Sequence, residues 1–160
     1  RSSYAAGRGT GSRMSLFLLD TNMASFAMKR QYPQVRAHLE RAAKKHAIGI
    51  SAVTQGELLY GLQRKGAPKE LGELIRGFLV RVEVLPWDAD VADTYGLVRA
   101  WCAQKGIVFS ALALMIAAHA IHLNATLITN DQSFQRLAVP MVPQAPFQLR
   151  LLDWSEPDTR

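Results

Sequence analysis

The sequence predicts an α/β fold in which helices flank a central, mainly parallel sheet. Short apolar runs alternate along the chain with longer segments of helical period, and no repeat or low-complexity block interrupts residues 14–152. The first run, SLFLL at 15–19, is nearly all apolar, as expected of a strand that is buried on both faces. Strands that alternate with helices form βαβ units with right-handed crossovers, which make the strands parallel.

Turn signals and hydrophobic period place the elements in chain order. Strands are predicted at 15–19, 48–50, 82–85 and 125–128. A helix is predicted to begin at 20–22, and further helices to cover 33–45, 51–62, 68–80, 89–104 and 112–123. Ser51 suits the N-cap of its helix, and Pro68 suits the first turn of the next one.

Composition limits the classes of protein to which the chain can belong. Its 160 residues suffice for one domain, and 49% apolar with 20% charged residues is ordinary for a globular protein. The longest apolar run, 111–118, is far shorter than the ~20 residues of a membrane-spanning helix. The single cysteine, Cys102, excludes an internal disulfide, and no signal-peptide pattern precedes Met14. We therefore expect a cytoplasmic protein that does not enter the membrane, with Cys102 as a small buried apolar residue.

The first 13 residues are rich in glycine, serine and arginine and have no apolar period. We interpret 1–13 as a disordered tail added for expression, with a natural flexible arm as the alternative. The domain is then predicted to cover 14–154, and 155–160 to form a C-terminal tail. The net charge is +6, and Arg1, Arg8 and Arg13 of the first segment account for half of it. The remaining basic excess is compatible with a polyanionic partner such as RNA.

Two acids are predicted at the carboxyl ends of strands, and a third on a helix. Asp20 follows the first strand, and Asp131 follows the fourth strand after Thr129 and one further residue. In open α/β sheets the functional crevice lies beyond these strand ends. Glu57 belongs to the helix after Ser51, on a stripe that we expect to face the sheet. The other members of this stripe are Val53, Tyr60 and Gly61.

Carboxylates that cluster repel one another and are costly to remove from water, so a divalent cation is their natural partner. Oxygen ligands without histidine or cysteine favour Mg²⁺ or Mn²⁺ over zinc. Each acid also has a simpler interpretation. Asp20 and Asp131 suit helix N-caps, and Glu57 could lie on a solvated helix face.

Several motifs follow one another along the chain: LLDTN at 18–22, SAVTQGELLYG at 51–61, LPWD at 85–88, YG at 95–96, IAAHA at 116–120, and LITND at 127–131 with Phe134. Taken in this order, they resemble the PIN-domain toxins of the VapC type. The resemblance extends from Met14 to Trp154.

This resemblance implies a three-layer α/β/α PIN fold with four to five short strands. It also implies a Mg²⁺- or Mn²⁺-dependent endoribonuclease from a bacterium or archaeon. Such toxins are neutralised by a VapB-type antitoxin, are usually homodimers, and often cleave a specific tRNA or rRNA loop. By the matching motifs, Asp20 and Glu57 are the first and second acids, and Asp131 is the fourth, whose position varies in the family. Asn22 and Thr129 match polar residues beside the acids.

The third acid departs from the family pattern. The family helix reads D-L-x-I-A-A-H-A, and Ala113 stands here in place of its aspartate. The other position used for the fourth acid holds Ser133, which has no carboxylate. A displaced catalytic group can cost roughly 10²-fold in rate, so we predict a weak or inactive nuclease. Either deliberate substitution or natural loss explains Ala113.

Other interpretations stay open beside this one. A non-catalytic PIN-like module would hold an antitoxin or RNA without cleaving it. A receiver-like signalling domain is disfavoured, because no second acid adjoins Asp20 and no lysine follows Lys105. A zinc site on His119 and His122 lacks a third ligand. Two groups of basic residues could contact RNA phosphates or form solvated helix faces: Arg36, Arg41, Lys44 and Lys45, and Arg64, Lys65 and Lys69.

Overall fold

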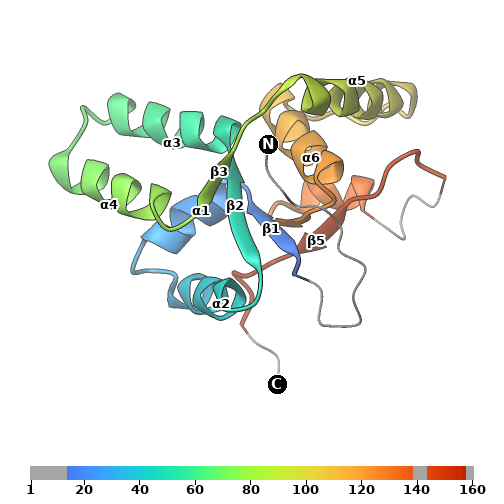
Figure 1. Cartoon of the computed structure of the whole chain (residues 1–160). Coiled ribbons are helices and arrows are strands. Elements are labelled where there is room, and N and C mark those ends of the chain that lie inside the picture. Colours follow the sequence, from blue (N-terminus) through green and yellow to red (C-terminus); the bar gives the residue numbers. More distant parts are fainter. Residues whose placement is uncertain (1–13, 139–143, 158–160) are drawn as a thin grey trace.

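The computed structural model describes residues 14–138 and 144–157 (Figure 1). The predicted tail 1–13 and residues 158–160 of the predicted C-terminal tail lie outside these ranges. A five-stranded sheet with the order β3-β2-β1-β4-β5 forms the centre, and every neighbouring pair is parallel. The strands are β1 (Leu16–Leu19), β2 (Ala47–Ser51), β3 (Glu83–Leu85), β4 (Thr126–Ile128) and β5 (Arg150–Leu152).

Helices connect the strands in the predicted order. The connections hold α1 (Thr21–Met28) and α2 (Pro33–Ala43), then α3 (Ala52–Arg64) and α4 (Lys69–Leu79), then α5 (Ala89–Gln104) and α6 (Ala111–His122), and finally the 3-10 helix η1 (Gln132–Leu137). Neither β5 nor η1 was predicted. Arg150 and Leu152 of β5 are exposed, so this short edge strand has no buried apolar run to reveal it.

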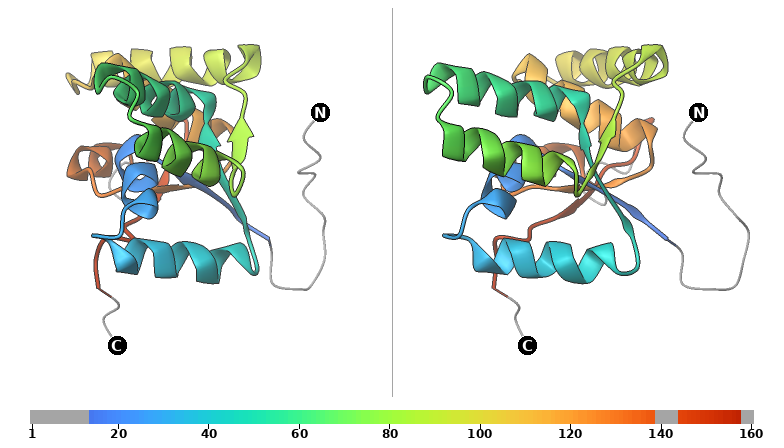
Figure 2. Two further views of the ribbon diagram at one scale, coloured as in Figure 1. Left: turned by 90° about the vertical axis from the view of Figure 1, so that its left-hand side faces the viewer. Right: turned by 60° about the vertical axis from the view of Figure 1, so that its left-hand side comes forward.

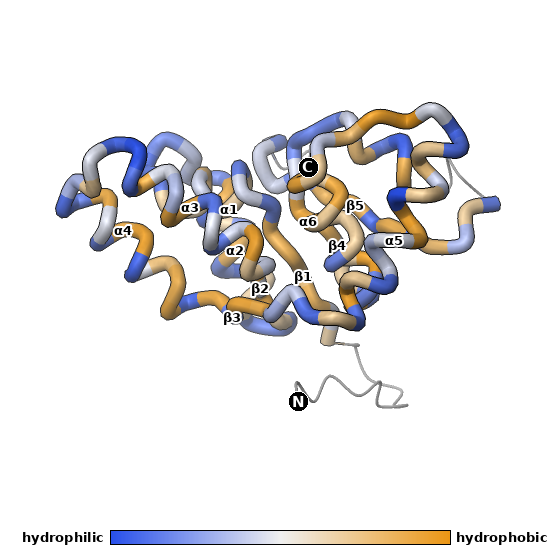
Figure 3. The backbone as a smooth tube through the Cα atoms, turned by 90° about the horizontal axis from the view of Figure 1, so that it is seen from above, coloured by the Kyte–Doolittle hydropathy of each residue, from blue (hydrophilic) through white to orange (hydrophobic). Residues whose placement is uncertain are grey.

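The sheet separates two apolar clusters, because neighbouring side chains of a strand point to opposite faces. Leu19 and Ile128 belong to one cluster, with residues of α1, α2, α3 and α4. Leu18 and Leu127 belong to the other, with residues of α5, α6 and η1. Figure 3 shows the two groups of helices on either side of the strands. The expected three-layer α/β/α arrangement is confirmed.

The carboxyl ends of all five strands lie at one edge of the sheet, because the strands are parallel. From β1 the chain moves to β2 on one side, and it later returns to β4 on the other. A crevice forms at such a switch point, where ligands bind in open α/β sheets. Helices α1 and α3 begin at this edge because they follow β1 and β2. Helix α6 leads into the amino end of β4, so its own beginning points toward the same edge.

Two further predictions concern membranes and Cys102. Within the described ranges, no helix is long and apolar enough to cross a membrane. Cys102 is a free cysteine that is only 2% exposed and packs in the second cluster. Its role as a small buried apolar residue is confirmed.

Candidate active site

Asp20 lies at the switch point, directly after β1. Its backbone N–H donates to the carbonyl of Ile128 at the end of β4, at 3.0 Å. One carboxylate oxygen, Oδ1, accepts from the N–H of Met23 at 2.8 Å and so caps α1. The other, Oδ2, accepts from the hydroxyl of Thr129 at 2.5 Å. The side chain is only 6% exposed. Burial and these two hydrogen bonds hold it at a defined position.

Thr129 connects Asp20 to Asp131 beyond the end of β4. Besides donating to Asp20, its hydroxyl accepts from the backbone N–H of Asp131 at 3.0 Å. The exposed carboxylate of Asp131 caps η1 by accepting from the N–H of Ser133 at 2.9 Å. The structure thus brings Asp20, Thr129 and Asp131 together, and both acids also serve as helix caps.

The environment of Asp20 disfavours its charged form. Burial raises the pKa of Asp20 above its ordinary value of 3.8 and outweighs the hydrogen bonds from Thr129 and Met23, which lower it. The negative charges of Asp131 and Asp153 raise this pKa further. A cation beside these carboxylates would relieve the repulsion.

Asp153 was not predicted as a site residue. It follows β5, and its carboxylate accepts from the N–H and the hydroxyl of Ser155 at 2.8 and 2.6 Å. Asp153, Asp131 and Glu156 line a pocket of about 190 Å³ at the ends of β4 and β5, which we call the acidic pocket. A signal was present: Leu151-Leu152-Asp153 repeats the order of Leu18-Leu19-Asp20, but without a predicted strand it could not be placed.

Glu57 lies on α3, at the border between its buried and exposed faces. The hydroxyl of Thr21 donates to that of Thr54 at 3.3 Å and joins α1 to α3. Glu57 is one turn beyond Thr54 on the same side of the helix. It is half-buried, and its side chain has no hydrogen bond or ion pair with a described residue.

The prediction that the stripe around Glu57 faces the sheet is wrong for one of its members. Tyr60 does not face the sheet but is 61% exposed. Because α3 packs against α1 and α4, its buried face is instead made by Thr54, Leu58 and Leu62. This rotation places Glu57 beside the buried face rather than within it.

Ala113 occupies the first turn of α6. Its N–H donates to the hydroxyl of Ser110, the N-cap, at 3.1 Å, and its half-buried side chain packs against the second apolar cluster. No acid is present in this turn. Helix α6 thus begins without a carboxylate where the family pattern has one. Asn22, in the first turn of α1, is exposed.

His119 ties α6 to the end of β2. Its Nδ1 lies 2.9 Å from the hydroxyl of Ser51, which also caps α3 by accepting from the N–H of Val53 at 3.1 Å. His119 is 1% exposed, and burial lowers its pKa to about 4. His122 on the same helix is exposed. His119 therefore packs as a neutral side chain between elements of the sheet edge.

The donors at the strand ends can be compared with the needs of a metal ion. Among the described residues, no three histidine, cysteine, aspartate or glutamate side chains are close enough to hold a metal. The acids around Asp20 offer oxygen atoms and negative charge, which suit Mg²⁺ or Mn²⁺. The chemistry of these oxygen donors thus fits a hard cation. The described residues nevertheless bring fewer than three such ligands close together.

The chain is similar to a known domain family and to known proteins over most of its length. The pattern of the PIN domain matches residues 17–140. The chain is 34% identical to the tRNA(fMet)-specific endonuclease VapC of Shigella flexneri, over 89% of this chain and 100% of that protein. It is 33% identical to ribonuclease VapC2 of Rickettsia felis, over 76% of this chain and 92% of that protein.

Solved structures show the same fold. The chain superposes on VapBC2 from Rickettsia felis, bound to a DNA fragment from its promoter, with a TM-score of 0.76 and 32% identity. That match covers 87% of this chain and 98% of the other. DNA-bound VapBC from Salmonella typhimurium also gives a TM-score of 0.76 at 32% identity, over 88% and 99% of the two chains.

Proposed function

Because the chain belongs to the PIN-domain family as a toxin of the VapC type, we propose that it is a metal-dependent endoribonuclease weakened by Ala113. The observation that carries this proposal is the buried Asp20 carboxylate, hydrogen-bonded to Thr129 and flanked by the negative charges of Asp131 and Asp153. Burying a carboxylate among other carboxylates is unfavourable unless a cation joins them. Such an arrangement suits a metal-binding site better than a purely structural one.

By the resemblance to the family motifs, Asp20, Asp131 and Glu57 would together hold a Mg²⁺ or Mn²⁺ ion, although the described residues do not bring three such side chains close enough together. When bound, the cation supplies positive charge at the scissile phosphate and activates water for hydrolysis. Asp20 is held for this task by hydrogen bonds to both of its oxygens. Thr129 orients Asp20, and Asn22 at the start of α1 offers a polar side chain near the substrate. Without a carboxylate at position 113, we expect weaker metal affinity and slower cleavage.

The names of the relatives support a proposal for the substrate and the inhibitor. One relative is named for specificity toward tRNA(fMet), and solved relatives are VapBC complexes. We therefore propose a tRNA or another structured RNA as the substrate and a VapB-type antitoxin as the inhibitor. On the resemblance to VapC-type toxins, we also propose a homodimer as the assembly. Protein recognition of structured RNA depends on loop shape rather than on a readable code, so no particular cleavage site is proposed.

The test is cleavage of total tRNA with added Mg²⁺ or Mn²⁺. We compare the chain as it stands, the Ala113→Asp variant, and the Ala113→Asp variant that also carries Asp20→Ala. Defined fragments from the Ala113→Asp variant alone are expected, because only this protein holds every acid of the family pattern. Ala113→Asn is the matched control, since it has nearly the size of the aspartate without its charge.

A non-catalytic module is the second candidate function. The observation in its favour is that no three metal-binding side chains assemble within the described ranges. This module would bind an antitoxin or RNA without cleaving it. If none of the variants cleaves RNA and calorimetry detects no Mn²⁺ binding, the nuclease proposal is wrong and the module is favoured.

A further inference from the structure

A basic hollow lies at the turn between α1 and α2. It has a volume of about 480 Å³. Lys29 and Arg30 are exposed at its rim, and Arg36 is half-buried. The residues that line it, which together define the basic hollow, are Lys29, Arg30, Pro33, Arg36, Ala37 and Glu40.

The cations of the basic hollow are available to a ligand. Lys29 and Arg30 form no ion pair with any residue in the described part of the chain. The guanidinium of Arg36 donates to the carbonyl of Met28 at 3.4 Å, which orients it without neutralising its charge. Glu40 is the single acid in the lining, so positive charge exceeds negative there. A concave surface of this charge suits a phosphate group.

The basic hollow adjoins the segment that carries the acidic pocket. The side-chain amide of Gln34, in the first turn of α2, donates to the carbonyl of Ser155 at 3.2 Å. Ser155 in turn donates to Asp153, which lines the acidic pocket. Figure 2 shows the C-terminal segment passing the end of α2 that begins at Pro33. One short segment thus contacts α2 beside the basic hollow and also carries Asp153 of the acidic pocket.

We propose that the basic hollow binds backbone phosphates of the RNA substrate beside the acidic pocket. The physical reason is that a cluster of carboxylates repels a polyanion. Cations to the side of the cluster are therefore needed to hold the RNA while one phosphate reaches the acids. This inference rests on the proposed function, because it assigns the basic hollow to the same substrate.

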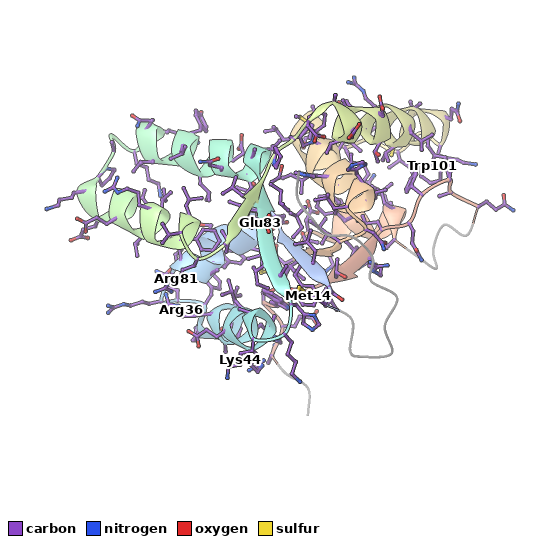
Figure 4. All side chains as sticks on the ribbon, in the orientation of Figure 1. Met14, Arg36, Lys44, Arg81, Glu83 and Trp101 are labelled. Carbon is purple, nitrogen blue, oxygen red and sulfur yellow. The ribbon has the colours of Figure 1, made fainter. Side chains whose placement is uncertain are left out.

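The other end of α2 provides a matched control. Lys44 and Lys45 are exposed, but they follow the last turn of α2 and precede the amino end of β2. They lie toward the sheet edge opposite to the acids. Figure 4 labels Arg36 and Lys44, which stand on α2 and directly after its last turn. Neutralising Lys44 and Lys45 changes the net charge by the same amount as neutralising Lys29 and Arg30.

The experiment measures binding without cleavage. A fluorescently labelled RNA hairpin is titrated with the full chain in EDTA, over a series of salt concentrations. The Lys29→Gln, Arg30→Gln double variant is compared with the Lys44→Gln, Lys45→Gln double variant. Each lost phosphate contact lowers the slope of log affinity against log salt by about 0.7 for a single strand, and by about 0.9 for a duplex. We expect a fall of about 1.4 to 1.8 for the first pair and no change for the second.

Equal falls in the salt slope for both pairs would show a general effect of net charge and would overturn the proposal. An unchanged salt slope for both pairs would overturn it as well. A DNA hairpin of the same sequence is the second probe. If only the DNA responds to Lys29→Gln, Arg30→Gln, the basic hollow is a DNA contact and the RNA proposal is wrong. Because these measurements need neither metal nor cleavage, their outcome is independent of the Ala113→Asp activity test.

Discussion

At the scale of single residues, the hydrogen bond from Thr129 to Asp20 fixes the position of the central carboxylate. It joins residues at the ends of two neighbouring strands, far apart in sequence. Both side chains are buried, so neither can replace its partner readily with water. The carboxylate keeps a fixed orientation despite an environment that raises its pKa.

Replacing Thr129 with valine removes the hydroxyl while preserving the shape of the side chain. The buried oxygen Oδ2 of Asp20 then loses its donor. An unsatisfied buried polar group costs about 1–3 kcal/mol, so Thr129→Val should lower the free energy of unfolding by that amount. Urea denaturation measures it. Thr129→Ser, which retains the hydroxyl, is the control, and equal stability of the two variants would contradict the assigned role.

The raised pKa of Asp20 predicts a pH dependence of stability. A carboxyl whose folded-state pKa lies above its unfolded value of 3.8 contributes stability below 3.8 and loses it as pH rises through the folded-state pKa. Asp20→Asn can keep an oxygen for the N–H of Met23 but does not titrate. The variant should therefore gain stability relative to the parent as pH rises above 3.8, measured by urea unfolding in EDTA. A difference that does not change with pH would argue against the raised pKa.

At the scale of elements, His119 and Ser51 join α6 to the beginning of α3. This contact sets the position of α6, which carries Ala113, relative to α3, which carries Glu57. Trp87 adds a second link, because its indole N–H donates to the carbonyl of Met115 on α6 at 3.0 Å. Helices α3 and α6, to which the resemblance assigns the second and third acid positions, are thus fixed to the same sheet edge.

His119 should make the protein sensitive to acid. Its folded-state pKa of about 4 lies below the ordinary value of 6.5. The neutral side chain therefore contributes its full share to the free energy of unfolding above pH 6.5. This contribution is lost as the pH falls toward 4, by at most about 1.4 kcal/mol per pH unit. His119→Gln does not titrate and should flatten this loss in urea unfolding. The exposed His122 supplies the control: His122→Gln should leave the slope nearly as it is, and an equal effect of both variants would refute the assignment.

At the scale of the whole molecule, five parallel strands bring their carboxyl ends to one edge. Acids from β1, β4 and β5 gather there, and the basic hollow lies beside them on the α1–α2 turn. A negative centre with a positive flank is the charge distribution that a metal-dependent nuclease needs for a polyanionic substrate.

Metal binding should stabilise the whole fold when the ligand set is complete. A ligand at a hundredfold excess over its Kd adds about 2.7 kcal/mol to the free energy of unfolding. We expect Mn²⁺ to raise the Tm of the Ala113→Asp variant more than that of the parent, and EDTA to reverse the rise. Ala113→Asn should behave like the parent. A rise of equal size in the aspartate and asparagine variants would show that position 113 does not act through a carboxylate.

Most elements were predictable because their signals are local. Helix α5 begins at Ala89 and ends at Gln104 as predicted, since Asp88 caps it and its buried positions keep a helical period. Strand β1 was predicted from its continuous apolar run, which reflects burial on both faces. Strand β5 lacks such a run because it is an exposed edge strand. The orientation of Tyr60 was mispredicted because α3 turns a different face toward α1 and α4.

The sequence by itself determined the α/β architecture, the caps at Ser51 and Asp131, and the absence of a carboxylate at position 113. These depend on neighbours along the chain. Only the tertiary structure decided that Asp153 shares a pocket with Asp131, and that Asp20 is buried with Thr129 as its donor. Charges and hydrogen bonds act between groups that are close in space. The order of the strands in the sheet therefore determines which polar groups lie close enough to interact.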